Sequence, residues 1–275
     1  KSLDAIAEIQ PGLSGDNLSH VKPVSYLARD GQAIAAYLTV PRGAVAEKLP
    51  LVVMPHGGPQ ARDNQSFNFL VQFLASRGYA VFQPNFRGST GYGKAFEQAG
   101  FKQWGGLMQD DVTDGAKWLV EQGIADPDRM CIVGWSYGGY SAAMGAVKTP
   151  ELFRCAASIN GVLDLVRQIS EDKDYIGGRR WTEHMGLTDE KAREVSPYHQ
   201  AEAIRIPMLI VQALDDSRVT REQGQRMARR LEKLDKPVEY VEVRQGGHSL
   251  GNESARLAML EALEKFLVQN IAPVN

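Results

Sequence analysis

Apolar residues in this chain form short continuous runs separated by longer amphipathic segments. Uninterrupted apolar runs are typical of strands that are covered by helices on both faces. Such runs are found at Leu51–Met54, Ala80–Phe82, Met130–Gly134, Cys155–Ile159 and Met208–Val211, and Val238–Val243 is a further predicted strand. Between them, apolar residues recur at helical spacing. The segments with this spacing are 69–74, 112–120, the residues after 136, 227–234 and 257–267.

Alternation of strand and helix over this length predicts an α/β protein with a doubly wound, mostly parallel sheet. Two earlier strands, Val21–Ala28 and Gln32–Val40, flank the turn Arg29-Asp30-Gly31 and predict an antiparallel edge at the amino-terminal side. Residues 1–20 are polar and weakly periodic, as in a linker or a trimmed segment. Residues 21–275 are predicted to form one catalytic domain, with an insertion at about 161–205 over the carboxyl edge of the sheet.

Composition and charge exclude several classes of protein. The 275 residues carry a formal charge of −2, which argues against a nucleic-acid or acidic-membrane partner, and no apolar run is long enough to span a membrane. The two cysteines, Cys131 and Cys155, each lie near the start of a predicted strand, and we expect buried free thiols rather than a disulfide. No ligand spacing indicates a metal, and we expect no cofactor.

One segment carries the spacing of a nucleophile turn. The run Met130–Gly134 leads directly into Gly134-Trp135-Ser136-Tyr137-Gly138, and helix is predicted after it. A sharp strand-to-helix turn lifts a serine hydroxyl out of a sheet, and glycines on either side avoid clashes there. The alternative is a serine that only caps the helix. The strand and helix on either side favour Ser136 as the nucleophile of an α/β-hydrolase fold.

Two backbone amides are candidates for an oxyanion hole. The amide of Tyr137 stands at the start of the helix after Ser136. A second donor in this fold comes from the loop after an earlier strand, where His56-Gly57-Gly58-Pro59 follows Leu51–Met54. We expect the Gly58 amide to be this donor, with Gly57 as the second choice. His56 is expected only to order the loop.

The base and the acid follow the serine in the chain order of this fold. Of the five histidines, His248 alone lies between the last predicted strand and the last helix, in the turn Gln245–Ser249, and it is the predicted base. The acid should follow the strand Met208–Val211. Asp215 and Asp216 both lie in that loop, and their spacing from the strand barely separates them.

Taken together, the motifs resemble the catalytic domain of the prolyl oligopeptidase family, in its acylaminoacyl and dipeptidyl peptidase branch. The resemblance runs from about Val21 to the carboxyl terminus. The motifs that carry it are His56–Pro59, Asn85-Phe86-Arg87-Gly88-Ser89-Thr90-Gly91-Tyr92-Gly93, Gly134–Tyr140 and Gly247-His248. The family's acid stretch, His-Gly-x-x-Asp-x-x-Val, matches residues 212–219 and implies Asp216, although Gln212 and Ala213 replace its usual His-Gly.

The resemblance also implies a function. We expect a serine peptidase that hydrolyses short peptides through an acyl-enzyme, with a carboxylesterase on the same scaffold, or a non-catalytic fragment, as alternatives. A substrate pocket is implied at Val162, Leu165, Tyr175, Arg218 and Val219. Family members carry a β-propeller ahead of this domain, so a propeller outside this chain is a possible partner, and oligomers are possible. The expected location is the cytoplasm, with the periplasm and secretion left open.

Overall fold

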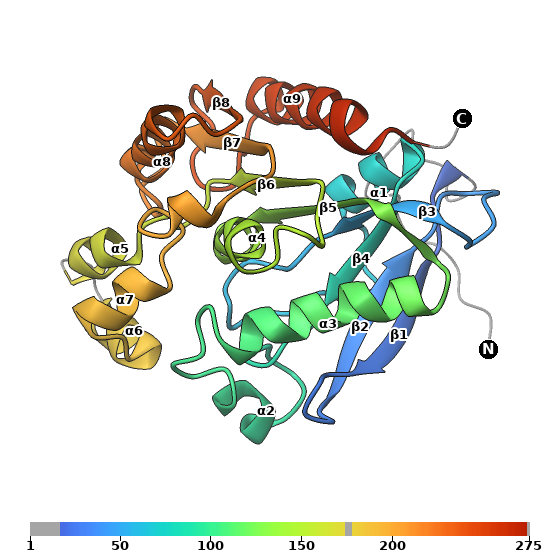
Figure 1. Cartoon of the computed structure of the whole chain (residues 1–275), viewed down its shortest axis with the longest axis horizontal. Helices are drawn as coiled ribbons and strands as arrows, with labels where there is room; N and C mark the ends of the chain where they lie inside the picture. Colours follow the sequence, from blue (N-terminus) through green and yellow to red (C-terminus); the bar gives the residue numbers. More distant parts are fainter. Residues whose placement is uncertain (1–16, 174–177, 274–275) are drawn as a thin grey trace, which may run out of the picture.

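The computed structural model describes residues 17–173 and 178–273, and within them one sheet has the strand order β1-β2-β4-β3-β5-β6-β7-β8 (Figure 1). The pairs β1–β2 and β2–β4 are antiparallel, and the other pairs are parallel, so the predicted sheet with its antiparallel edge is confirmed. The strands are β1 (Val21–Leu27), β2 (Ala33–Thr39), β3 (Leu49–Val53), β4 (Ala80–Pro84), β5 (Ala125–Trp135), β6 (Cys155–Ile159), β7 (Met208–Ala213) and β8 (Val238–Val243).

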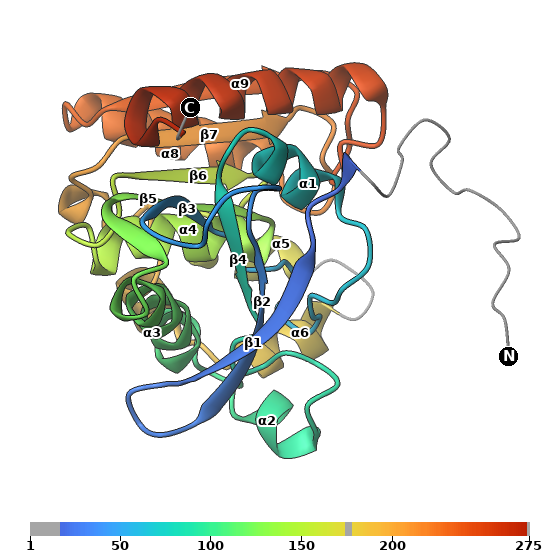
Figure 2. The ribbon, with the colours of Figure 1, turned by 90° about the vertical axis from the view of Figure 1, so that its right-hand side faces the viewer.

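Helices cover both faces of the sheet. On one face lie α1 and α9, and on the other lie α3, α4 and α8 (Figures 1 and 2). Alternate residues of β5 divide between the two layers, with Ile132 on the α4 side and Val133 on the α9 side. The helices are α1 (Phe69–Ser76), α2 (Lys94–Gln98), α3 (Leu107–Glu121), α4 (Tyr137–Lys148), α5 (Leu165–Asp172), α6 (Gly178–Met185), α7 (Asp189–Glu194), the 3-10 helix η2 (Ala201–Ala203), α8 (Arg221–Lys233) and α9 (Glu253–Ile271).

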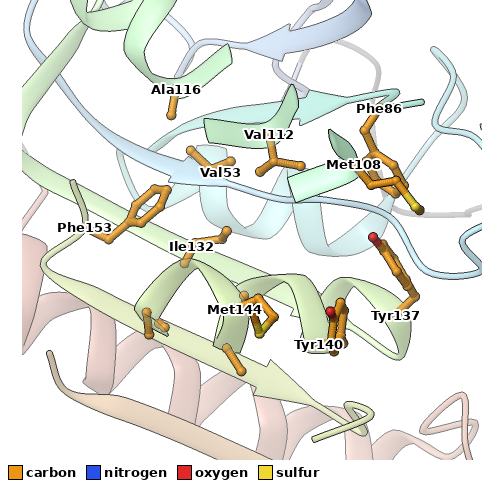
Figure 3. Close-up of a cluster of buried hydrophobic side chains, with 14 of the residues drawn as sticks. Val53, Phe86, Met108, Val112, Ala116, Ile132, Tyr137, Tyr140, Met144 and Phe153 are labelled. Carbon is orange, nitrogen blue, oxygen red and sulfur yellow. The ribbon is translucent and has the colours of Figure 1, made fainter. Parts of the chain in front are cut away.

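The first turn of α4 packs into the core between the sheet and α3. Tyr137 and Tyr140 are buried there, and Figure 3 shows them on the side of α4 that faces Met108 and Phe86. Tyr137 also meets Trp104 edge-on, at 4.5 Å between ring centroids. Aromatic rings bury large areas and make specific contacts, so this packing holds the start of α4, and the residue before it, in place.

The segment predicted as an insertion forms α5, α6, α7 and η2 between β6 and β7. Helix α5 contacts both α6 and α7. Most of the predicted linker 1–20 lies outside the described residues. Within those residues, no helix combines the length and the apolar character needed to cross a bilayer.

The prediction of two free thiols is wrong. Cys131 on β5 and Cys155 on β6 occupy facing positions in the parallel ladder, and they form a disulfide with 4.7 Å between their Cα atoms. Both residues are fully buried. Parallel pairing brings the two Cα atoms into the range that a disulfide can bridge. Their separation of 24 residues in sequence carries no information about this register.

A buried carboxyl lies in the loop after β3. The Oδ2 atom of Asp63 is inaccessible and has no hydrogen-bond partner, although the residue as a whole is half-buried. Burial raises the pKa of Asp63 to about 7, against a weaker opposing effect of a hydrogen bond from Gln83. The folded protein therefore holds this proton more tightly than the unfolded chain does. Because the folded state binds more protons between about pH 4 and 7, Asp63 makes stability fall as the pH rises through that window.

We expect Asp63→Asn to raise the Tm at pH 8, where the wild-type carboxyl is ionised, by several degrees. At pH 5, where the wild-type carboxyl is protonated in the folded state, the same substitution should change the Tm by little. Thermal unfolding followed by circular dichroism at the two pH values measures both effects. An equal change at both pH values would mean that ionisation of Asp63 does not limit stability.

Candidate active site

Ser136 occupies a sharp turn between β5 and α4. Its φ of 59° is in the left-handed region, which non-glycine residues seldom adopt, and its amide donates to the carbonyl of Ile159 at 2.9 Å. The turn requires glycine on both sides. A Cβ at Gly134 would lie 2.1 Å from the carbonyl oxygen of Gly138, and a Cβ at Gly138 would lie 2.1 Å from that of Pro55. The Ser136 side chain makes no capping hydrogen bond to an amide of α4, so the alternative of a serine that only caps the helix is not supported.

An imidazole and a carboxylate meet at the carboxyl edge of the sheet. Nδ1 of His248 donates to Oδ2 of Asp216 at 2.7 Å. The other oxygen of Asp216 accepts from the amides of Arg218 and Val219 at 2.8 and 2.9 Å. An ionised carboxylate can only accept, so Nδ1 carries the proton of the neutral ring, and Nε2 keeps its lone pair. These three bonds fix the carboxylate against the ring.

Asp215 lies in a different place from its neighbour. Its Oδ1 accepts from the amides of Gly246 and Gly247 at 3.0 and 2.9 Å, and its side chain is exposed. The structure thus brings Asp216, and not Asp215, to the imidazole. Asp215 instead holds the backbone just before His248. The two adjacent carboxylates therefore bind the same loop in different ways: Asp215 binds its backbone amides, and Asp216 binds the His248 side chain.

The His248 loop is attached to the Ser136 turn. The indole nitrogen of Trp135 donates to the carbonyl of His248 at 2.8 Å. Trp135 immediately precedes Ser136, so this bond links the backbone of the predicted base to the residue next to the predicted nucleophile. The histidine, the acid loop and the serine turn therefore converge from β8, β7 and β5, at the edge where ligands bind in open α/β sheets.

The loop after β3 brings Gly58 to the same place. Nδ1 of His56 lies 2.8 Å from the Gly57 carbonyl, and Nε2 lies 2.8 Å from Oγ of Ser89. The ring stacks on Phe86 at 4.4 Å, and burial lowers the pKa of His56 to about 4, so it is neutral at pH 7. Because Gly57 C=O and Gly58 N–H point to opposite sides of one planar peptide, holding the carbonyl directs the amide. His56 orders the loop, as the sequence analysis expected.

We expect His56→Ala to lower kcat/KM by on the order of 10²–10³, the effect of losing one oxyanion donor. Without the imidazole, the Gly57 carbonyl loses this hydrogen bond, and the peptide that carries the Gly58 amide is free to turn. Steady-state hydrolysis of a peptidyl anilide measures this effect. The exposed His20, replaced in the same way, should leave kcat/KM unchanged, and equal rates for both variants would show that the orientation of Gly58 does not matter.

A small cavity lies beside Ser136. Of the predicted pocket residues, Val162, Arg218 and Val219 line it, while Leu165 is fully buried outside the lining and Tyr175 lies outside the described residues. The lining residues are Gly58, Trp104, Ser136, Tyr137, Val162, Gln168, Arg218 and Val219.

Two lining residues, Trp104 and Gln168, were not predicted from the sequence. Gln168 lies three residues after Leu165, on the next turn of α5, so helical spacing from Leu165 could have pointed to it. No comparable signal marks Trp104, which comes from the loop before α3. A larger groove, lined by residues such as Pro41, Val45 and Gly78, contains none of the predicted catalytic residues. Across residues 17–173 and 178–273, no cluster of His, Cys, Asp or Glu side chains could hold a metal ion.

Comparison with known proteins gives consistent results. A sequence model described as "Prolyl oligopeptidase family" matches residues 65–273. The chain is 36% identical to the dipeptidyl aminopeptidase BIII of Pseudoxanthomonas mexicana, over 98% of this chain and 41% of that protein. It is 30% identical to dipeptidyl peptidase family member 6 of Caenorhabditis elegans, over 98% of this chain and 40% of that one.

Among solved structures, a puromycin-hydrolysing peptidase of Mycobacterium tuberculosis superposes with a TM-score of 0.89 at 28% identity. The superposition covers 96% of this chain and 41% of that one. The chain thus spans about two fifths of the length of the proteins that it matches.

Proposed function

This chain belongs to the prolyl oligopeptidase family of serine peptidases, and we propose that it hydrolyses short peptides through an acyl-enzyme on Ser136. The observation that carries the proposal is the hydrogen bond between His248 and Asp216, made on a loop that Trp135 ties to the serine turn. A serine hydroxyl is a poor nucleophile at neutral pH and needs such a base.

The proposed reaction has two halves. Nε2 of His248 removes the proton of the Ser136 hydroxyl as Oγ attacks the substrate carbonyl, and Asp216 stabilises the imidazolium that forms. The imidazolium then gives this proton to the leaving amine, the carbon–nitrogen bond breaks, and the acyl group stays on Ser136. In the second half, His248 takes a proton from water as the water oxygen attacks the ester carbonyl. The imidazolium then returns this proton to Oγ of Ser136, the bond between Oγ and the acyl carbon breaks, and the acid leaves.

The amides of Tyr137 and Gly58 are the proposed oxyanion donors. Tyr137 is the first residue of α4, so its amide has no partner within the helix and carries part of the positive end of the helix dipole. The Gly58 amide comes from another segment that lines the cavity, the loop after β3, where His56 holds the adjacent carbonyl. Two donors on separate rigid elements need little reorganisation when the oxyanion forms.

The cavity favours a small apolar side chain at the cleaved position. Val162, Val219, Trp104 and Tyr137 are four of the eight residues that line it. The exposed cation of Arg218 stands at the same cavity, where it can bind a substrate carbonyl. Short peptides cut near their amino terminus, in the manner of acylaminoacyl or dipeptidyl peptidases, suit this arrangement. The predicted β-propeller lies outside this chain and stays a prediction.

The test compares amide and ester substrates on the same enzyme. We expect turnover of acetyl-alanyl and alanyl-alanyl nitroanilides, with kcat/KM falling as the residue at the cleaved bond is enlarged from alanine to phenylalanine. A short-chain nitrophenyl ester is the reference substrate. Hydrolysis of the ester without any hydrolysis of the anilides would make the protein a carboxylesterase and refute the peptidase proposal.

A further inference from the structure

Asn160 is a buried polar residue at the centre of the site, and no step of the proposed reaction uses it. It follows the last residue of β6, between the strand that leads to Ser136 and the strand that leads to Asp216. Its side chain is fully buried, and its φ of 45° is in the left-handed region. Asparagine tolerates that region better than most residues, but the conformation still costs free energy.

The carboxamide of Asn160 bonds to two loops at once. Its Oδ1 accepts from the amide of Ala213, at the end of β7, at 2.8 Å. Its Nδ2 donates to the carbonyl of His248 at 3.0 Å and to that of Gly247 at 3.3 Å. One planar group therefore sets the distance between the start of the acid loop and the backbone of the histidine loop.

The His248 carbonyl is held from two directions. Trp135, on the serine side, and Asn160, on the acid side, both donate to this one oxygen. A carbonyl with two lone pairs can accept both bonds, and the pair restrains the peptide more tightly than either bond does. The imidazole and the restrained carbonyl group are bonded to the same Cα atom of His248, so the direction of the ring depends on how the backbone is held. The bond from His248 to Asp216 fixes one end of the ring, and the held backbone fixes the other.

Only an amide can make these bonds at this position. Aspartate of the same shape would keep the acceptor for Ala213 but would turn an oxygen toward the two carbonyls. A hydroxyl is too short to reach both loops. We propose that Asn160 is a positioning residue, whose carboxamide spaces the Asp216 and His248 loops and so aims the imidazole at Ser136. This inference rests on the proposed function of the triad.

The test uses two substitutions that remove different hydrogen-bonding groups of Asn160. Asn160→Asp keeps the acceptor and removes the donors, while Asn160→Gly removes both and suits the positive φ. We expect each variant to lower kcat by on the order of 10²-fold, the cost of a catalytic group displaced by about 1 Å, and to change KM by little. The far-downfield proton resonance of the bond from His248 to Asp216 should broaden or disappear in both.

A matched control separates positioning from stability. Asn68 caps α1, away from the site, by accepting from the amides of Leu70 and Val71. We expect Asn68→Ala to lower the Tm and to leave kcat and the downfield resonance unchanged. Folded Asn160 variants with wild-type kcat and an intact resonance would overturn the proposal.

Two further results keep the test decisive. If neither Asn160 variant folds, Asn160→Ser is the third variant, because its hydroxyl is too short to reach both loops, and a wild-type kcat and resonance in that variant would overturn the proposal as well. If wild-type protein does not react with a fluorophosphonate, the function proposed for Ser136 fails, while the downfield resonance still reports whether Asn160 places the ring.

Discussion

Ser136→Ala is expected to abolish peptide and ester hydrolysis, with kcat lowered by about 10⁶-fold. The substitution removes only Oγ. It keeps the Cβ in the strained turn and the amide bond to Ile159, so the fold should not change. A stopped assay over hours with a peptidyl anilide measures the residual rate. Mass spectrometry after fluorophosphonate treatment should place the adduct on the peptide that contains Ser136 in the wild type and find none in the variant.

The exposed Ser66 provides the matched control, since Ser66→Ala removes a hydroxyl from a loop away from the cavity. Its activity and its labelling should equal those of the wild type. Wild-type labelling at a residue other than Ser136 would refute the assignment of the nucleophile. Folded wild-type protein that takes up no label would support a non-catalytic domain instead.

Asp216→Asn is expected to lower kcat by about 10⁴-fold, while Asp215→Asn should lower it by less than about tenfold. An amide at position 216 can donate to Nδ1 of His248, which moves the ring proton to Nε2 and removes the lone pair that accepts the proton of Ser136. An amide at position 215 still presents an oxygen to the amides of Gly246 and Gly247.

Steady-state kinetics of the two variants, with circular dichroism as a check on folding, measures both effects. The adjacent positions make each variant the control for the other, because the change in charge is the same. If Asp215→Asn shows the larger loss, then Asp216 is not the acid of the triad, and the bond seen between Asp216 and His248 is structural.

The succession of elements could be predicted from the sequence because it depends on local patterns. Continuous apolar runs such as Met130–Gly134 become strands wherever helices cover both faces of a sheet. The glycines around Ser136 have a purely local reason, since a Cβ at Gly134 would collide with the backbone of Gly138. The chain order of nucleophile, acid and base then pointed to the loops that contain Asp216 and His248.

Contacts between distant segments were decided by the tertiary structure alone. The register of β5 against β6 brings Cys131 and Cys155 together, and no spacing in the sequence encodes a register. The packing of the loop before α3 likewise brings Trp104 to the cavity beside Ser136, where no pattern in the sequence had placed it.

The same distinction applies at the proposed catalytic residues. The sequence by itself determined which residue types stand at the end of each strand, because local sterics and hydrophobic pattern set the elements. Spacing from β7 left Asp215 and Asp216 almost equivalent, and the resemblance to the family implied Asp216. Only the packed loops gave one carboxylate to the imidazole and the other to the backbone, and placed Asn160 between them. These roles depend on hydrogen bonds of 2.7 to 3.0 Å between segments that are far apart in the chain.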